Sequence, residues 1–162
     1  MTTLRDRLRI DETGLEHPAV ESLIRAHRDD LMQHSPPGSV HAFQADAFSD
    51  PAVTLLTAWD GERLVGCGAL KRHGGVDAGL GELKTMRTVD AYRGQGAGAA
   101  LLERLLERAR HDGLSRLALE TGSGTPFEPA LALYARYGFV ACGPFADYDP
   151  DPFSTFLSLT LD

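Results

Sequence analysis

The stretch "AYRGQGAGAALLERLLERAR", residues 91–110, places three alternating glycines directly before a strongly helical run. Glycine inside regular structure costs backbone entropy, so glycines at alternate positions mark a place where the backbone itself is used. The leucines and alanines that follow recur at helical spacing, which predicts an amphipathic helix that ends at Gly113. The stretch therefore predicts a glycine-rich turn that opens a helix.

A turn of this kind suits an anionic ligand. Backbone N–H groups at a helix N-terminus have no partners within the helix, and the helix dipole is positive there. Together they attract phosphate, and glycines let the ligand approach the backbone without a Cβ in the way. Arg93, directly ahead, adds a permanent cation. The alternative is a tight strand-to-helix turn that holds no ligand.

Strands are predicted on both sides of this helix, at residues 82–89 ("ELKTMRTV") and 115–121 ("SRLALET"). The order strand, helix, strand predicts a right-handed parallel crossover. Side chains alternate between the two faces of a strand, so residues 82–89 divide into two sets. One face is expected to carry Leu83, Thr85, Arg87 and Val89, and the other Glu82, Lys84, Met86 and Thr88.

The rest of the chain supplies further elements around this unit. Two β-prone runs flank Asp60-Gly61, which predicts a hairpin over residues 53–72. Thr125, Pro126 and Glu128 form a capping-box pattern, which predicts the start of a helix that ends at Gly138. The other expected elements are a helix at 17–33 and strands at 3–10, 139–143 and 151–161. Together they predict an α/β or α+β sandwich with a mixed sheet.

The composition indicates one domain over residues 1–162 and disfavours several kinds of function. The chain is 43% hydrophobic, which is enough for a core. A net charge of −7 argues against nucleic-acid or anionic-membrane binding, and no apolar run approaches the roughly 20 residues of a membrane span. Two cysteines without CxxC spacing, and no signal peptide, indicate a cytoplasmic protein. The six histidines show no paired spacing, so no metal site is expected.

The glycine spacing distinguishes among phosphate-binding motifs. The Walker pattern GxxxxGK[ST] is absent. Gly94, Gly96 and Gly98, followed by Ala99, give GxGxG rather than the dinucleotide fingerprint GxGxxG. Glu120 follows the glycines by about the number of residues at which that fingerprint places its acidic residue. A dinucleotide-binding site therefore stays an alternative. The preceding strand argues against it, because it is polar where the first strand of such folds is apolar.

The segment "YRGQGAG" resembles the CoA-pyrophosphate loop of the GNAT superfamily of acyl-CoA N-acyltransferases, through Arg93, Gly96 and Gly98. "LALYARYGF" is similar to a second element of that family, and "MRTV" stands where its splayed central strand offers backbone groups to the pantetheine arm. The resemblance covers residues 53–142 well. It implies a mixed, mostly antiparallel central sheet with splayed central strands, flanked by helices. The matching residues of the second element are Ala130, Tyr134, Gly138 and Phe139.

The family resemblance implies an N-acetyltransferase that uses acetyl-CoA as co-substrate and no metal. The acceptor would be a primary amine of a small molecule, amino acid or peptide, which attacks the thioester directly. Family habit also implies a possible homodimer. The resemblance assigns cofactor binding to Met86, Arg87, Thr88, Arg93, Gly94, Gln95, Gly96, Ala97, Gly98 and Ala99.

The same chemistry assigns candidate catalytic residues. An alkyl amine with a pKa of about 10.4 arrives protonated at neutral pH, so the site needs a route for its proton. Glu82 stands where some family members carry their base, Glu120 is the second candidate, and a solvent-fed site without a base is the third. A backbone N–H from residues 86–88 would stabilise the oxyanion. Tyr134 would protonate the leaving thiolate; the alternative is a core tyrosine.

Two features leave the function open. Phe127 stands where many family members carry an asparagine that helps hold the cofactor arm. The acceptor side is expected at residues 144–154, with Arg87, Lys84 and His73 as partners for a substrate carboxylate. A non-catalytic CoA-binding sensor and a nucleotide-binding oxidoreductase domain are the competing hypotheses.

Overall fold

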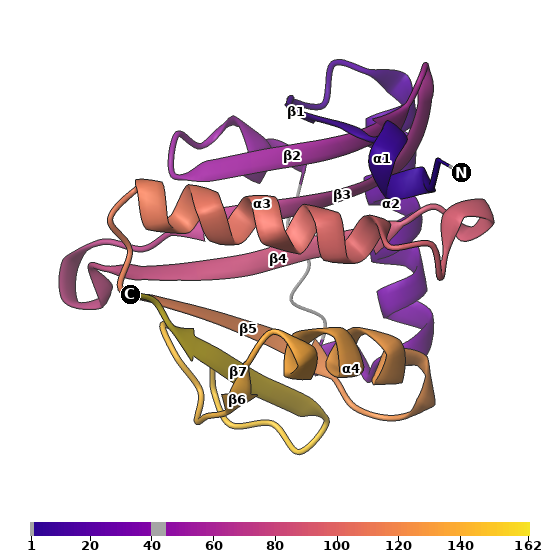
Figure 1. Ribbon diagram of the computed structural model, residues 1–162. Coiled ribbons are helices and arrows are strands. Elements are labelled where there is room, and N and C mark those ends of the chain that lie inside the picture. The colour runs from indigo at the N-terminus through magenta and orange to yellow at the C-terminus, as the bar shows by residue number, and fades with distance from the viewer. Residues whose placement is uncertain (1, 40–44) are drawn as a thin grey trace.

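The computed structural model describes residues 2–39 and 45–162, and its seven strands form one sheet in the order β1-β2-β3-β4-β5-β7-β6 (Figure 1). Neighbouring strands are antiparallel except β4 and β5, which are parallel. The predicted mixed, mostly antiparallel sheet is therefore confirmed. The strands are β1 (Arg9–Glu12), β2 (Val53–Asp60), β3 (Arg63–Arg72), β4 (Leu80–Thr88), β5 (Arg116–Gly122), β6 (Val140–Ala141) and β7 (Ser154–Thr160).

Helices cover both faces of the sheet (Figure 1). The leucines of α3 and the inner side of α4 pack on one face, and α2 packs on the other against β2 and β3. The helix predicted at 17–33 is one helix, and Gly113 and Gly138 follow helix ends with positive φ, as expected. The helices are α1 (Leu4–Arg7), α2 (Pro18–His34), α3 (Ala97–His111) and α4 (Glu128–Arg136), with 3-10 turns at Pro37–Ser39, Ala45–Ser49, Gly75–Asp77, Asp90–Tyr92 and Thr125–Phe127.

The two central strands separate along their length. Between β4 and β5 only three pairs are in register, from Leu80↔Arg116 to Glu82↔Ala118. Both strands continue beyond that point, β4 to Thr88 and β5 to Gly122. The sheet therefore opens into a V at its centre, which confirms the expected splayed strands.

A β-bulge in β4 lies at the start of this opening. Thr85 has a φ of +57, and Ala69 pairs with Lys84 while Cys67 pairs with Arg87. Between these two pairs, one residue on β3, Gly68, thus faces two on β4, Thr85 and Met86. Register partners share a face, so Lys84 and Arg87 both lie on the α2 face, with Cys67 and Ala69.

The predicted division of β4 into two faces is wrong beyond this bulge, because the extra residue reverses the alternation. Met86 packs on the α3 side, where a Cβ added to Gly68 would lie 2.5 Å from its sulfur. Thr88 lies on that side too, near Gly98 of α3. Glu82 therefore shares its face with Arg87, and not with Met86 and Thr88.

Two local predictions are also wrong. Residues 3–10 are not one strand: Thr3 caps the short helix α1 by a capping box with Asp6, and only the segment from Arg9 is extended. The predicted capping box at Thr125 does not form, since a 3-10 turn takes up Thr125–Phe127 and Phe127 stands at the N-cap of α4 without a side-chain hydrogen bond. In the ranges 2–39 and 45–162, no helix has the length and apolar character to cross a membrane.

Candidate active site

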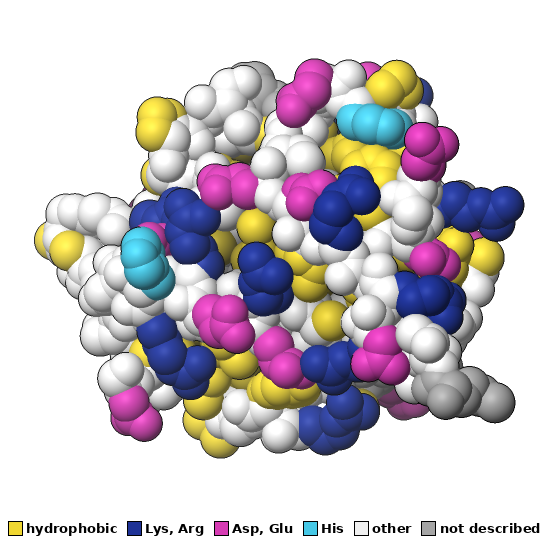
Figure 2. Space-filling model, turned by 45° about the horizontal axis from the view of Figure 1, so that its top comes forward, with side chains coloured by type: hydrophobic (Ala, Val, Ile, Leu, Met, Phe, Trp, Pro, Cys, Tyr) yellow, Lys and Arg dark blue, Asp and Glu magenta, His cyan; other side chains and the backbone are white. Residues whose placement is uncertain are grey.

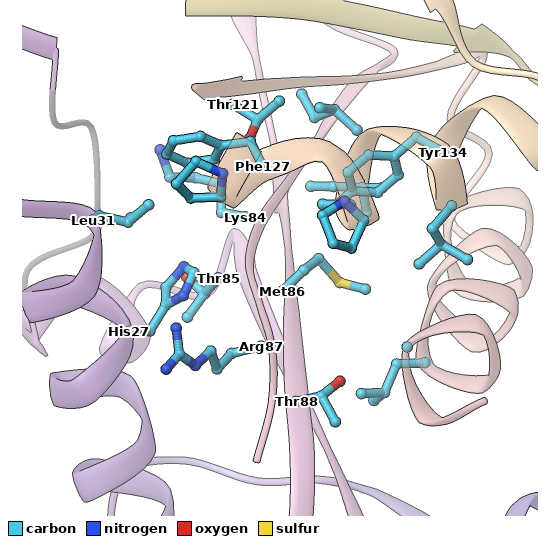
Figure 3. A pocket seen from close by; sticks show the side chains of 18 of the residues that line it. His27, Leu31, Lys84, Thr85, Met86, Arg87, Thr88, Thr121, Phe127 and Tyr134 are labelled. Carbon is cyan, nitrogen blue, oxygen red and sulfur yellow. The ribbon is translucent and has the colours of Figure 1, made fainter. Parts of the chain in front are cut away.

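A cavity of about 710 Å³ opens where β4 and β5 diverge. Its walls come from α2, the ends of β4 and β5, the glycine loop before α3, and α4 (Figure 3). The cavity brings together all three predicted catalytic side chains and eight of the ten predicted cofactor-binding residues. Those lining it are Glu82, Glu120 and Tyr134, and Met86, Arg87, Thr88, Arg93, Gly94, Gly96, Gly98 and Ala99.

Two predicted cofactor-binding residues do not line this cavity. The side chain of Gln95 is exposed and donates from Nε2 to the carbonyl oxygen of Ala91, 3.3 Å away. Ala97 is buried in the core beneath the first turn of α3. Any contact of these two residues with a ligand would therefore come from their backbone groups.

The glycine loop has the geometry of an anion site. Gly96 is the N-cap of α3 with φ +91, and no side chain caps this end of the helix. Gly94 has φ +75, and a Cβ added there would meet no atom within 4 Å. The loop thus combines uncapped backbone N–H groups with open space beside them, which fits the pyrophosphate of a nucleotide cofactor. Arg93 stands beside the loop, 2.9 Å from Asp90 and more than half exposed.

Charges of both signs are interspersed on one face of the molecule (Figure 2). On the face shown in Figure 2, dark blue Lys and Arg side chains lie among magenta Asp and Glu side chains. Basic and acidic side chains of the described residues also form ion pairs, such as Arg5 with Glu103 and Arg108 with Glu12. This face therefore lacks the extended positive field that nucleic acid requires.

Tyr134 projects from α4 into the cavity (Figure 3). The ring is buried and packs edge-on against Phe139, with 5.5 Å between centroids. Burial raises the pKa of the phenol well above its usual value, because ionisation would place a charge in an apolar setting. The hydroxyl is therefore a neutral donor throughout the physiological pH range.

Glu82 is buried at the point where β4 and β5 separate, and three polar side chains surround its carboxylate. Tyr148 donates to Oε2 from its hydroxyl, and Lys84 Nζ lies 3.3 Å from the same oxygen. His73 Nε2 lies 3.0 Å from Oε1. Lys84 Nζ also donates to the Tyr148 hydroxyl over 2.9 Å, which closes the cluster.

Tyr148 is a site residue that sequence reasoning located only as part of the segment 144–154. The loop before β7 places it against Phe145 and Phe156 over the end of β5. Burial, followed by the nearby charge of Glu82, raises the pKa of its hydroxyl. No periodic pattern marks a tyrosine in an irregular loop, so only the fold reveals its contact with Glu82.

Glu120 lies on the same face of the sheet as Glu82, two residues beyond its register partner Ala118. Its carboxylate Oε2 accepts a hydrogen bond from Ser154 Oγ on β7, 2.7 Å away. Glu120 is half-buried and lines the cavity. Both candidate carboxylates therefore face the opening between the strands.

The α2 wall of the cavity holds an unexpected polar pair. Arg87 Nη1 donates to Asp30 Oδ2 over 2.8 Å, while its Nε and His27 Nδ1 are buried without hydrogen-bond partners in the described part of the chain. Burial, aided by the charge of Arg87, lowers the pKa of His27 to about 4. Arg87 and Lys84 are both already paired with carboxylates, which argues against their predicted role toward a substrate carboxylate.

The buried cysteine Cys67 and the arrangement of potential metal ligands also bear on the chemistry of the site. Burial raises the pKa of the Cys67 thiol to about 12, so it is not a nucleophilic thiolate at neutral pH. Over the described residues, no group of three or more His, Cys, Asp or Glu side chains is arranged to hold a metal ion. The cavity is thus built around carboxylates, phenols and backbone donors.

The family model of the acetyltransferase (GNAT) family matches residues 20–139. The chain belongs to the GNAT family of acetyltransferases. It is 45% identical to the N-acetyltransferase YedL of Escherichia coli K12, named as uncharacterized, over 94% of each chain. It is 38% identical to the IAA acetyltransferase of Azospirillum brasilense over 78% of this chain and 80% of that one.

A solved structure agrees with this assignment. The crystal structure of a Klebsiella pneumoniae protein assigned as an acyl-CoA N-acyltransferase is similar to this structure. The sequence of that protein is 30% identical to this chain. The two structures superpose with a TM-score of 0.75, and the match covers 96% of this chain and 98% of that one. This GNAT protein is accordingly an acetyl-CoA-dependent N-acetyltransferase, and the fold class expected from its sequence is confirmed.

Proposed function

We propose that this GNAT enzyme acetylates a primary amine of a small molecule, amino acid or peptide, and that the amine attacks the thioester directly. The observation that carries the proposal is the single cavity that joins the uncapped glycine loop to Glu82, Glu120 and Tyr134. One end of this cavity suits the cofactor, and the other suits an acceptor that must lose a proton.

The glycine loop and the end of β4 fit acetyl-CoA. Backbone N–H groups from Gly94 to Ala99 would hold the pyrophosphate, with Arg93 beside them. Backbone groups of Met86–Thr88 face the opening beyond the last β4–β5 pair and would hold the pantetheine arm. When bound, acetyl-CoA supplies the acetyl group as a thioester. Phe127 lines the same cavity in place of the family asparagine.

Protein groups would stabilise the charge on the carbonyl oxygen, accept the proton of the amine and donate to the leaving sulfur. A backbone N–H of residues 86–88 stabilises negative charge on the carbonyl oxygen. Glu82 accepts the proton that the acceptor amine must lose, either directly or through a water. Tyr134 donates a proton or a hydrogen bond to the departing sulfur, since its phenol stays neutral. Glu120 is the alternative base.

The proposal of a small acceptor rests on two supports. The Azospirillum relative is named for a small molecule, and the acceptor half of the cavity is enclosed by α2 and the β4–β5 opening. Carboxylates dominate this half, since Lys84 and Arg87 are paired. A cationic or neutral amine therefore matches the site better than an acidic acceptor does.

Cofactor binding is tested by thermal unfolding with acetyl-CoA, CoA and NAD. At 100 times its Kd a ligand adds about 2.7 kcal/mol of stability. We expect both CoA forms to raise the Tm and NAD to leave it unchanged. A rise with NAD alone would instead support the dinucleotide alternative.

A matched pair of glycine variants locates that binding. Gly94 and Gly113 have almost the same φ, +75 and +76, and each has open space at the position that a Cβ would occupy. Gly94→Ala and Gly113→Ala should therefore cost a similar free energy of unfolding, about 1 kcal/mol. Only Gly94→Ala should reduce the Tm rise caused by acetyl-CoA. Equal rises in both variants would place the cofactor elsewhere.

Catalysis is tested with a panel of amines and detection of the released thiol. Thiol release that depends on an amine supports the enzyme proposal and identifies the acceptor class. Acetyl-CoA binding without thiol release from any amine would support the non-catalytic sensor. The cytoplasmic location and the homodimer remain predictions, the second of which is tested by light scattering of the purified protein.

A further inference from the structure

A second hollow shares Glu82 and Lys84 with the main cavity. It measures about 640 Å³ and is more open to solvent. Glu82 and Lys84 line both spaces, whereas His73 lines only the second. The carboxylate of Glu82 therefore stands between the acceptor cavity and a separate route to solvent. Among the residues that the structure describes, the second hollow is also lined by Gly38, Lys71, Ala146, Asp147, Tyr148, Asp149, Pro150, Asp151 and Pro152.

The two oxygens of Glu82 have different partners. Oε2 accepts from Tyr148 and lies beside the Lys84 ammonium, so two donors already engage this oxygen. Oε1 faces only the imidazole of His73, 3.0 Å away, among the described residues. An imidazole nitrogen can accept a proton as well as donate one, while an ammonium cannot. A proton that reaches Glu82 is thus directed to Oε1 and toward His73.

His73 is placed to pass a proton onward. Its Nε2 contacts Glu82, and its side chain is 13% exposed, against 4% for Glu82. Its Nδ1 makes no hydrogen bond with any residue that the structure describes, and the ring borders the second hollow. The two nitrogens therefore connect a buried carboxylate to solvent.

We propose that Glu82 and His73 form a proton exit that carries the acceptor proton from the main cavity into the second hollow. This inference rests on the proposed acetyl transfer. The ammonium N–H bond of the acceptor breaks and an O–H bond forms at Oε1 of Glu82. That proton then moves to Nε2 of neutral His73, which carries its own proton on Nδ1. The Nδ1 proton leaves to water in the second hollow, which leaves neutral His73 with its proton on Nε2. The starting tautomer returns when the Nε2–H bond breaks, with that proton passing to water, and water supplies a proton to Nδ1.

The charges around the exit favour this direction. Lys71 stands opposite Glu82 in the β3–β4 register, and Lys84 and Tyr148 hold the other oxygen. Asp147, Asp149 and Asp151 line the second hollow from the loop before β7, and Glu120 faces the cluster from β5. The carboxylates on the solvent side stabilise a transient imidazolium, which eases proton transfer out of the cavity.

The experiment measures kcat against pH with an amine that the panel identifies. His73→Ala should lower kcat at least about tenfold, the lower part of the range for proton-transfer groups. Added imidazole should restore much of the loss, because it can enter the open hollow, and the restored rate should follow the basicity of substituted imidazoles. His73→Gln keeps a polar contact with Glu82 but cannot relay a proton, so it should be equally slow. His111→Ala, at an 84% exposed histidine that lines neither cavity, is the control.

The outcomes distinguish a failure of the proposed proton exit from a failure of the proposed acetyl transfer. Unchanged kcat in His73→Ala, with an active wild type, would overturn the exit alone. A slow His73→Ala that imidazole does not rescue, with His73→Gln at the wild-type rate, would make His73 a structural residue and also overturn it. No thiol release by the wild type with any amine would overturn both proposals. ¹⁵N spectra of the histidines provide a readout without an acceptor: Glu82→Gln should change the tautomer balance of His73, and an unchanged balance would contradict the coupling.

Discussion

The thiol of Cys67 on β3 donates a hydrogen bond to the carbonyl oxygen of Thr85 on β4, 3.3 Å away. This contact lies at the bulge where the strand register changes. A buried thiol thereby satisfies a carbonyl that the regular ladder leaves without its partner. The bulge in turn places Lys84 and Arg87 on one face and Met86 on the other, which builds the two walls of the cavity.

Thr85 adopts a backbone conformation that is costly for a β-branched residue, with φ +57. Thr85→Gly removes a cost of about 1–2 kcal/mol and adds the larger chain entropy of glycine, about 0.5–1 kcal/mol. We therefore expect an unchanged or slightly higher free energy of unfolding in urea. Thr88→Gly, in the same strand but without positive φ, should lower it. A loss above about 1 kcal/mol in Thr85→Gly would contradict a strained bulge.

The order strand, helix, strand predicted the parallel central pair, and the glycine loop predicted the anion site. The mostly antiparallel sheet and the other predicted residues of the cavity came from the family resemblance, and the α2 wall with His27 and Asp30 was not predicted. The sequence did not predict the bulge, since nothing in "ELKTMRTV" marks Thr85 as an inserted residue. One unmarked residue was enough to reverse the faces of Met86, Arg87 and Thr88. The contact of Tyr148 with Glu82 was missed for another reason: it joins residues 66 positions apart through an irregular loop.

Tyr134→Phe tests the proposed proton donor. The change removes one buried hydroxyl and keeps the packing against Phe139, so the Tm and acetyl-CoA binding should stay close to the wild type. We expect kcat to fall about 100-fold. Tyr137→Phe is the matched control, because Tyr137 donates to Glu103 over 2.6 Å and does not line the cavity. Equal kcat values in the two variants would make Tyr134 a core residue.

His27 predicts a pH dependence of stability. Its pKa is about 4 in the folded protein and about 6.5 when unperturbed, so between these values the unfolded chain binds the additional proton. The folded state is therefore favoured above about pH 6.5 and loses this contribution as the pH falls toward 4. The neighbouring charges are Arg87, which lowers the pKa, and Asp30, which opposes it.

Urea unfolding at several pH values measures this effect. Between pH 6.5 and 4, we expect the wild type to lose about 2 kcal/mol more than His27→Gln, which has no titrating group at this position. His111→Gln, at an exposed histidine, should follow the wild type. Parallel curves for the wild type and His27→Gln would show that His27 titrates normally in the folded protein.

The two carboxylates at the β4–β5 opening differ in burial and in the number of side chains that contact them. Glu82 is 3% exposed and contacts His73, Lys84 and Tyr148, whereas Glu120 is half-buried and accepts a hydrogen bond from Ser154. If Glu82 is the base, Glu82→Gln should lower kcat by about 100-fold or more. Glu120→Gln should change kcat less than about fivefold.

Acetyl-CoA binding separates chemistry from folding in this comparison, because neither carboxylate touches the glycine loop. Both variants should show the wild-type Tm rise with acetyl-CoA. Glu82→Gln should still lower the starting Tm, because it removes the buried negative charge beside the Lys84 ammonium. The reverse result, a large loss of kcat in Glu120→Gln and a small one in Glu82→Gln, would assign the base to β5. Small losses in both would leave proton removal to solvent, since then neither carboxylate accepts the proton in the rate-limiting step.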